Sequence, residues 1–429
     1  MDRETITLTM KEMRRLQTIE MALAGRITNS EGARRLELSE RQFKRLRKRV
    51  AQEGPQGAIH KARGRRSNHR MPEAERERIR ELLENTYVGF NDTHAHEMLT
   101  ERHGVTACRQ TVRAIRREAG ISSVRRRRAP KHRTRRERRG RSGAMLLMDG
   151  STHDWLEGRG PKMTLIGVID DATSEVLALS FEPTEDLAGY LRVFERILST
   201  KGVPASTYSD RSSIFFQNSP ALTIEQQLEG EVPLTQFGRA LDELGVEMIR
   251  SLSPQGRGRV ERLWATLQDR LVSELRLEGA CDLHAANAYL ATFLPRFNTR
   301  FAHPAADGVD EWLKAPSDLD WHLCAKYMRT VGNDNTVRLG ERTVDVPPGP
   351  HRLTWAKARV EVHELADGRL RIVREGQVIA TQGPPEGFTR LMPRHTKGLV
   401  QAGQLPVAAL KRRCKECGAT HDRPMRQAG

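Results

Sequence analysis

Three acidic residues stand where the chain leaves a hydrophobic segment, and their types and positions suit metal-dependent chemistry. Asp149 ends the apolar run 145–148, Asp210 follows the segment 207–209, and Glu261 opens an amphipathic stretch. A carboxylate beside a buried strand costs several kcal/mol of desolvation unless a partner offsets it, and hard cations prefer oxygen ligands. We therefore predict that these three residues bind two Mg²⁺ ions, with Mn²⁺ as an alternative, in a site that cuts phosphodiester bonds.

The elements around these acids follow the order of a ribonuclease-H-like fold. Hydrophobic periodicity from residue 143 onward predicts strand, strand, strand, helix, strand, helix, strand, helix. The strands are expected at 145–148, 163–169, 175–180, 205–208 and 247–249, and the helices at 185–198, 236–244 and 261–276.

This order brings the three acids to one edge of a sheet. Asp149 is expected at the end of the first strand and Asp210 just past the fourth, and these strands are neighbours in such a sheet. The helix that begins near Glu261 has apolar residues at helical spacing, so it can pack on the sheet and lean its carboxylate toward the same edge. The apolar residues are Val260, Leu263, Trp264, Leu267 and Leu271.

Positive charge is concentrated in the first third of the chain. The net charge is +17 over 429 residues, but residues 1–142 carry +19 and residues 143–429 carry −2. This segregation predicts an N-terminal part that neutralises nucleic-acid phosphates and a nearly neutral body with another task.

Residues 8–52 have the spacing of a helix-turn-helix, with helices expected at 10–23, 29–36 and 40–50. Thr28 with Glu31 and Ser39 with Gln42 match the capping box that starts a helix. Glu37 occupies a turn position that often has glycine. The third helix is basic enough for a major groove and its phosphates, with a solvated charged face as the alternative. Its candidate DNA-binding residues are Arg41, Lys44, Arg45 and Lys48.

A second helical set is expected at 73–86, 94–102 and 109–118. Asn91 or Asp92 is the predicted N-cap of the middle helix. The last helix is expected to expose Arg113, Arg116 and Arg117, of which Arg113 and Arg116 are candidate DNA-binding residues. Two helix-turn-helix units in tandem would span a longer DNA site than one.

The segment 125–141 contains eleven basic residues and one acidic residue. Such a run repels itself, so we expect a linker that orders along a phosphate backbone, or else a disordered spacer.

The C-terminal part reads as short strands with glycine-rich turns, and the pair Asp367-Gly368 is a hairpin signal. A small β-barrel is expected, with strands at 336–339, 342–346, 359–363, 370–373 and 378–380. The basic tail from 396 is expected to be disordered. Its Cys414, Cys417 and His421 form a zinc-knuckle pattern without a certain fourth ligand.

The predicted fold class is multidomain α+β, with N-terminal helix-turn-helix domains, a ribonuclease-H-like α/β core and a C-terminal small β-barrel. Five scattered cysteines indicate a reducing compartment, and no signal peptide or apolar run of ~18 residues is recognisable, so we expect a cytoplasmic protein without membrane contact. The expected divisions are 1–70, 71–123, the linker 124–142, the core with its helical extension 143–320, the barrel 321–395 and the tail 396–429.

The sequence around the three acids resembles that of the DDE transposases of bacterial insertion sequences, which belong to an integrase-like superfamily. The matching segments are LMDGSTHDW at 147–155, YSDRSSIF at 208–215 and SPQGRGRVERL at 253–263. Together with residues 266–271 they look most like the ISNCY-type group, and the resemblance covers nearly the whole chain.

The resemblance implies that Asp149, Asp210 and Glu261 form the metal-binding catalytic triad. It implies binding of the element's terminal inverted repeats by residues 1–123, hydrolysis that exposes 3′-hydroxyl ends, and transfer of those ends into target DNA. Both DNA ends must be handled together, so a homo-oligomer on double-stranded DNA and a nucleoid-associated bacterial location are expected.

Two local features qualify the match. The second and third acids are 51 residues apart, a long separation that we interpret as a surface insertion at about 216–235. Arg257, Arg259 and Arg262 flank Glu261 and are candidate contacts to the DNA backbone, with surface cations near a helix start as the alternative.

Other protein classes explain less of the sequence. A structure-selective nuclease of the same fold would account for the three acids but not for two DNA-reading modules. A DNA-binding regulator without catalytic activity would not need all three acids. A tyrosine recombinase is disfavoured because no Arg-His-Arg cluster precedes a suitably placed tyrosine.

Overall fold

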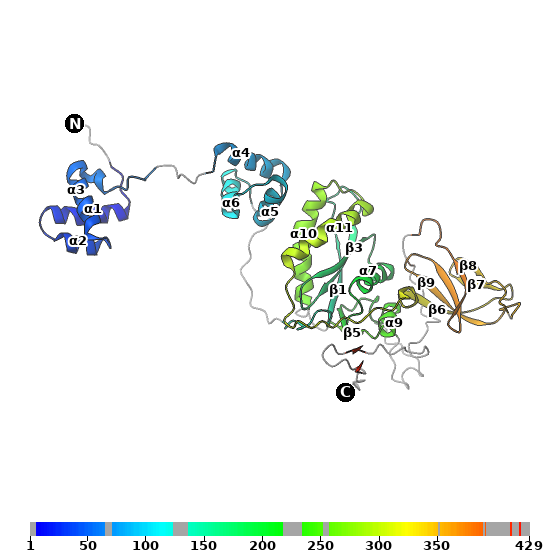
Figure 1. Cartoon of the computed structure of the whole chain (residues 1–429). Helices are drawn as coiled ribbons and strands as arrows, with labels where there is room; N and C mark the ends of the chain where they lie inside the picture. Colours follow the sequence, from blue (N-terminus) through cyan, green and yellow to red (C-terminus); the bar gives the residue numbers. More distant parts are fainter. Residues whose placement is uncertain are drawn as a thin grey trace. The chain divides into compact units, whose positions relative to one another are not determined.

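The chain divides into two compact units, Met1–Ile79 and Arg80–Gly429 (Figure 1). The computed structural model describes residues 6–64, 71–122, 136–217, 234–251, 257–350, 352–388 and 391, and the backbone of 412–413 and 420–421. Among these described residues, no helix is both long enough and apolar enough to span a bilayer.

The N-terminal unit contains the three predicted helices. They are α1 (Met10–Leu23), α2 (Asn29–Arg35) and α3 (Glu40–Glu53), followed by the 3₁₀ turn η1 (Gly54–Ala58). Ser39 and Gln42 form the reciprocal capping box, whereas the Thr28 hydroxyl accepts only the backbone N–H of Glu31. The predicted helix starts are therefore confirmed, one by a full box and one by half of it.

Close packing fixes the angle between α2 and α3. Phe43 is fully buried, and a Cβ atom on Gly32 would lie 2.3 Å from the Phe43 ring, so the helices approach where α2 has no side chain. Glu37 in the intervening turn has φ = 54°, the left-handed region that glycine tolerates best. The sequence thus accepts local strain at the position noted for its missing glycine.

The second helical set begins with α4 (Glu73–Glu81) and the π-turn η2 (Leu82–Thr86) and continues with α5 (Asp92–His103) and α6 (Arg109–Glu118). Asn91, one of the two predicted N-caps, is the N-cap of α5 and accepts the N–H groups of Thr93 and His94.

The prediction that Arg116 is exposed is wrong, because only 4% of this residue is accessible. It lies one turn after buried Val112, on the face of α6 that packs inward. Its guanidinium donates to the Phe90 carbonyl at 2.6 Å and to Asp92 at 3.0 Å, which compensates its burial. Arg113 on the neighbouring face is exposed.

The five strands of the core sheet follow one another along the chain as predicted. Within the sheet they are arranged in the order β3-β2-β1-β4-β5. Strands β1, β2 and β3 are antiparallel neighbours, and β4 and β5 run parallel to β1. The strands are β1 (Leu146–His153), β2 (Met163–Asp170), β3 (Val176–Glu182), β4 (Ser206–Ser209) and β5 (Glu247–Arg250).

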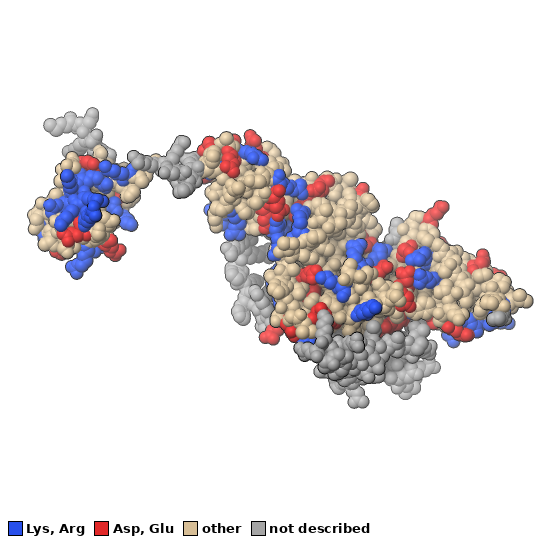
Figure 2. All heavy atoms as spheres, viewed as in Figure 1, with Lys and Arg blue, Asp and Glu red and all other residues tan. Residues whose placement is uncertain are grey.

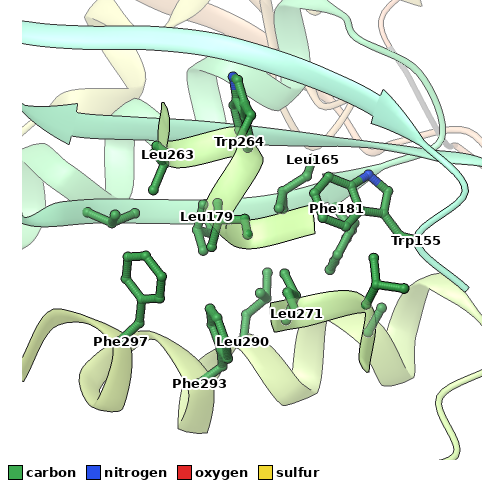
Figure 3. Packing of buried hydrophobic residues seen from close by; sticks show 14 of the residues in the cluster. Trp155, Leu165, Leu179, Phe181, Leu263, Trp264, Leu271, Leu290, Phe293 and Phe297 are labelled. Atoms are coloured by element: carbon green, nitrogen blue, oxygen red, sulfur yellow. The ribbon is translucent and has the colours of Figure 1, made fainter. Parts of the chain in front are cut away.

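Helices cover both faces of this sheet (Figure 1). Leu146 and Met148 pack toward α7 (Leu187–Thr200) and α9 (Gln236–Glu243). The alternate residues Met145 and Leu147 belong to the opposite cluster, with α10 (Gly258–Leu277) and α11 (Leu283–Phe301). Figure 3 shows this second cluster, in which Trp264 of α10 lies against the sheet.

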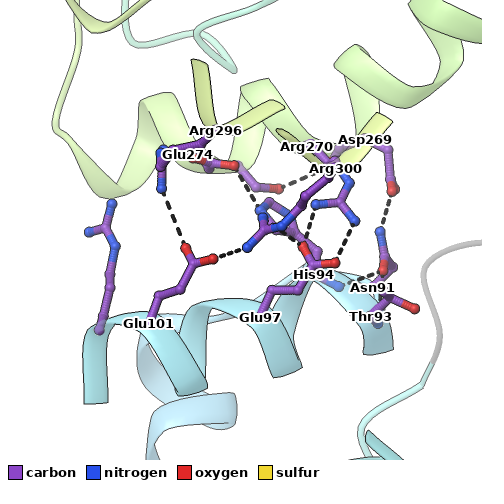
Figure 4. Close-up of polar contacts among 12 residues, drawn as sticks. Asn91, Thr93, His94, Glu97, Glu101, Asp269, Arg270, Glu274, Arg296 and Arg300 are labelled. Atoms are coloured by element: carbon purple, nitrogen blue, oxygen red, sulfur yellow. Dashed lines mark hydrogen bonds and ion pairs between the residues drawn. The ribbon is translucent and has the colours of Figure 1, made fainter. Parts of the chain in front are cut away.

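One face of α5 lies along α10 and α11, held mainly by charged groups (Figure 4). Glu97 pairs with Arg270 at 2.5 Å and with Arg300 at 3.0 Å. Buried His94 contacts Glu274 at 2.9 Å. Burial lowers the pKa of His94, so the ring is neutral near pH 7 and contributes a hydrogen bond rather than a full ion pair.

The C-terminal strands form a four-stranded antiparallel sheet in the order β11-β10-β9-β6 and a separate hairpin β7-β8. Both share one apolar core, but the described residues do not close into the predicted barrel. Strand β6, the first of these strands along the chain, was not predicted from the sequence. The elements are α12 (Leu319–His322), β6 (Cys324–Thr330), β7 (Thr336–Leu339), β8 (Arg342–Asp345), β9 (Arg359–Leu365), β10 (Leu370–Arg374) and β11 (Gln377–Gln382).

A buried ion cluster joins this sheet to the core. Glu243 of α9 contacts fully buried Lys326 of β6 at 2.9 Å and Arg239 at 2.6 Å. These cations and a hydrogen bond to His322 overcome the effect of burial and lower the pKa of Glu243 to about 2.

Gly368 has φ = 86° in the predicted β9–β10 hairpin.

Several sequence predictions fall outside the described residues. These are most of the basic linker, most of the insertion at 216–235, and the side chains of Cys414, Cys417 and His421. Of the tail, the backbone of β12 (Arg412–Arg413) and β13 (Thr420–His421) is described.

Candidate active site

Asp149 and Asp210 emerge from neighbouring parallel strands. The pairing of β1 with β4 joins Leu147 to Tyr208, and each acid lies two residues beyond that pair. The predicted convergence of these residues at one edge of the sheet therefore follows from the register.

The expectation that β1 ends at Asp149 is wrong. Asp149 is the fourth of eight strand residues and pairs with Gly167, because β1 continues along β2 to His153. The apolar run stops at Met148, but the backbone ladder to β2 does not need apolar side chains. The pairing of β1 with β4 ends at Leu147, so at Asp149 strand β1 has a neighbouring strand on its β2 side but not on its β4 side.

Two groups from α10 and its start hold the Asp149 carboxylate. Trp264 donates its indole N–H to Oδ2 at 2.9 Å, and Arg257 donates to Oδ1 at 2.6 Å. Burial raises the pKa of Asp149 above its ordinary value, and the opposing effects of Arg257 and Trp264 do not cancel the shift. The acid is thus nearly buried, at 8% exposure, but oriented by two donors.

Asp210 is more accessible and is fixed by its own turn. The backbone N–H of Ser212 donates to its Oδ1 at 2.9 Å, and its Oδ2 lies 3.8 Å from Arg257. Arg257 therefore bridges the two aspartates.

The third acid lies four residues after Arg257, at the start of α10. Glu261 is exposed in the first turn of α10. Burial lowers the pKa of Arg257, but Asp149, Asp210 and Glu261 together raise it above the ordinary arginine value. Within the described residues, no three acidic, histidine or cysteine side chains form a ready-made metal cluster. Asp149 and Asp210 thus share Arg257, whereas no ion pair joins Glu261 to this arginine within the described residues.

The other two predicted backbone-binding arginines near Glu261 differ in accessibility. Arg259 pairs with Asp171, which is fully buried in the turn after β2, and Arg136 pairs with the same carboxylate at 2.5 Å. Only 16% of the Arg259 side chain is exposed, so its main structural role is to tie the start of α10 to the sheet. Arg262 is exposed.

On α3, the predicted DNA-binding residues share one surface. Figure 2 shows a dense group of Lys and Arg side chains on the α1–α3 unit. Other basic residues of the helix have local partners, since Arg47 donates to Asn29 and Arg49 donates to the carbonyls of Gly57 and Ile59. The exposed residues that line a shallow hollow are Arg41, Lys44, Arg45 and Lys48, with Glu40 beside them.

Sequence reasoning missed one acid near the site. Glu185 was assigned only to the start of a helix, but the N-cap of α7 is Asp186, and Glu185 lies before it on the loop after β3. Its carboxyl group lies over Gly150, next to Asp149. No local pattern marks it, because its neighbours come from other strands. The helical spacing of the apolar residues around Trp264 predicted that this side chain packs on the sheet. It did not predict the hydrogen bond from Trp264 to Asp149.

Two curated proteins align with most of this chain. A putative transposase, y4bF of Sinorhizobium fredii (strain NBRC 101917 / NGR234), is 35% identical over 86% of this chain and 80% of its own length. The chain belongs to the transposases of insertion sequences. The transposase for insertion sequence IS1202 of Streptococcus pneumoniae is 30% identical over 78% of this chain and 77% of its own length.

Further comparisons concern parts of this transposase. Residues 15–77 match a winged helix-turn-helix family. The HTLV-2 integrase catalytic core domain in complex with magnesium is 17% identical, with a TM-score of 0.24 over 35% of this chain and 86% of that one. The simian T-cell lymphotropic virus intasome in complex with a PP2A regulatory subunit gives 11% identity and a TM-score of 0.30, covering 72% and 100%.

Proposed function

We propose that this transposase cuts and joins DNA at the edge of its core sheet, with Asp149, Asp210 and Glu261 as the metal-binding catalytic residues. In this proposal the enzyme hydrolyses the ends of its element to expose 3′-hydroxyl groups and transfers them into target DNA. The observation that carries the proposal is the position of Arg257, which lies 2.6 Å from Asp149 and 3.8 Å from Asp210 at the start of the helix whose first turn contains Glu261.

The donor set fits divalent magnesium. Carboxylate oxygens are the ligands that Mg²⁺ prefers, and Asp210 and Glu261 remain accessible to solvent and substrate. Two bound Mg²⁺ or Mn²⁺ ions would supply activation of the attacking water or 3′-hydroxyl and stabilisation of the leaving oxygen. Asp149 is the fixed member of the set, because Trp264 and the strand pairing hold it in place.

The cationic residues near these acids would position the DNA. Arg257 is the best placed of them, since a guanidinium released from Asp149 and Asp210 can donate two hydrogen bonds to a phosphate. Arg262 is exposed beside it, and Arg259 would act by holding the start of α10.

The helix-turn-helix unit supports recognition of double-stranded DNA, which we assign to the element's terminal inverted repeats. The exposed cations of α3 form its candidate groove-facing surface, and Arg113 of α6 is a second contact. Because two ends must be joined in one event, we infer a homo-oligomer on DNA. We assign the protein to the ISNCY-type group on the segments around the three acids.

The test uses purified full-length protein, labelled element ends and Mg²⁺ or Mn²⁺. We expect Asp149→Asn, Asp210→Asn and Glu261→Gln each to bind the ends with wild-type affinity and neither cleave nor join them. Asp154→Asn is the matched control and should retain activity, because Asp154 lies close in sequence but its side chain accepts the N–H of Gly158 and contacts neither Asp149 nor Arg257 among the described residues.

Each result separates the alternatives. Strand transfer retained by any of the three variants removes that residue from the site. Cleavage of branched DNA without joining of element ends would favour the structure-selective nuclease instead.

A further inference from the structure

The Glu185 carboxyl group lies directly against the backbone of the catalytic strand. A Cβ atom placed on Gly150 would lie 2.7 Å from Cδ of Glu185 and 2.9 Å from each of its carboxyl oxygens. Gly150 follows Asp149 in β1, so the loop between β3 and α7 brings a further acid beside the aspartate. Glycine at this position leaves the space that the carboxyl group occupies.

A rigid donor holds this carboxyl group in place. The Tyr190 hydroxyl donates to Oε1 of Glu185 at 2.6 Å. Tyr190 is 1% exposed and packs edge-on against Phe215, with ring centroids 4.8 Å apart. Burial, together with Glu185, Asp149 and Asp210, raises the pKa of Tyr190 well above its ordinary value, so the hydroxyl keeps its proton and donates.

Electrostatics place Glu185 in the same cluster as the two aspartates. Burial raises the pKa of Glu185 most, and its hydrogen bond from Tyr190 lowers it. Asp149 and Asp210 raise this pKa further, whereas Arg257 lowers it. Glu185 therefore lies within electrostatic range of Asp149, Asp210 and Arg257.

We propose that Glu185 is a positioning residue of the active site that strengthens its affinity for divalent cations. The proposal rests on the function proposed above. With Oε1 fixed by Tyr190, Oε2 makes no hydrogen bond within the described residues and remains an acceptor beside the Asp149–Asp210 pair. Glu185 adds a negative charge and an oxygen that can orient water around a bound ion.

A purely structural role is the alternative, in which Glu185 only anchors the start of α7 through Tyr190. The two roles differ in one respect. An anchor affects the stability of the fold, whereas the proposed role affects cation affinity at unchanged stability. Glutamine separates them, because its amide oxygen can still accept from Tyr190 but carries no charge.

The experiment measures Mn²⁺ binding to the full-length protein by the loss of the free-ion electron paramagnetic resonance signal. We expect Glu185→Gln to weaken Mn²⁺ binding about 10- to 100-fold, the range for residues that support metal ligands. Glu195→Gln is the matched control, since it also neutralises one glutamate, but Glu195 lies within α7 and its electrostatic neighbours include Asp320 and Asp367 rather than Asp149 and Asp210. It should bind Mn²⁺ like the wild type.

A second variant changes the position of the carboxyl group without changing any charge. Gly150→Ala should displace the Glu185 carboxyl group and weaken Mn²⁺ binding in the same direction, with thermal unfolding measured in parallel. The proposal is overturned if Glu185→Gln binds Mn²⁺ within twofold of the wild type while Asp149→Asn binds none. If Asp149→Asn also binds normally, the metal site itself is misplaced and both proposals fail.

Discussion

Substitution of Gly167 by alanine tests how the sheet positions the candidate site. Gly167 pairs with Asp149 across β1 and β2, and the Trp264 ring lies over it. An alanine Cβ would lie 2.8 Å from Cη2 of Trp264 and 3.1 Å from Cδ2 of Leu179. Ordinary carbon contacts are about 3.5–4.0 Å, so the indole that donates to Asp149 must move by roughly 1 Å.

The expected loss of stability follows from this overlap. Overpacking a core by one methyl group costs about 1–3 kcal/mol, and the gain from replacing a strand glycine offsets about 0.5–1 kcal/mol of it. The net loss is therefore at most about 2.5 kcal/mol, which corresponds to a decrease in Tm of up to roughly 10 °C for a domain of about 150–250 residues. Strand transfer should fall as well, because Trp264 is displaced from Asp149.

A double-mutant cycle identifies the cause. Trp264→Phe removes the outer ring atoms that meet the new methyl group, so Gly167→Ala should cost at least 0.5 kcal/mol less in the phenylalanine background. The assay is urea unfolding of all four proteins followed by circular dichroism. Strictly additive free energies of unfolding would refute the steric reasoning.

Three further predictions concern other parts of the chain. Glu243→Gln should destabilise the protein by about 3 kcal/mol at pH 7, because the lowered folded-state pKa of Glu243 stabilises the fold while this acid is ionised. The wild type should lose this stabilisation as the pH falls from about 5 to about 2, whereas the variant should not. Urea unfolding midpoints of both proteins across this pH range test the prediction. Glu97→Gln should speed hydrogen exchange of the α5 amides, because Glu97 pairs with Arg270 of α10 and Arg300 of α11, whereas Glu84→Gln in the exposed part of η2 should not. Equal exchange rates in the two variants would contradict this role of Glu97. Arg45→Ala should lower the slope of log affinity for DNA against log salt by about 0.9, while the exposed α1 residue Arg14→Ala leaves the slope unchanged.

Local patterns predicted elements well where the signal lies within a few residues. Ser39 with Gln42 and Asn91 mark helix starts that the structure contains, because capping bonds are made within one turn. The parallel neighbours β1 and β4 follow from the order of strands, and this order brought Asp149 and Asp210 together.

Features that depend on distant partners were not predictable in the same way. Arg116 reads as an exposed cation, but the Phe90 carbonyl and Asp92 allow it to be buried. Arg257 reads as a DNA contact, but it pairs with Asp149 across 108 positions of sequence. Glu185 carries no pattern at all, since only the fold places it over Gly150.

The central claim is that Asp149, Asp210 and Glu261 hold divalent cations at the edge of the sheet. The most direct measurement is anomalous diffraction from crystals of the full-length protein grown with Mn²⁺ and element-end DNA. We predict Mn²⁺ peaks within about 2.0–2.6 Å of carboxylate oxygens of all three residues, with Arg257 moved onto a DNA phosphate. Mn²⁺ bound elsewhere, or Arg257 still paired with Asp149 in the DNA complex, would contradict this account.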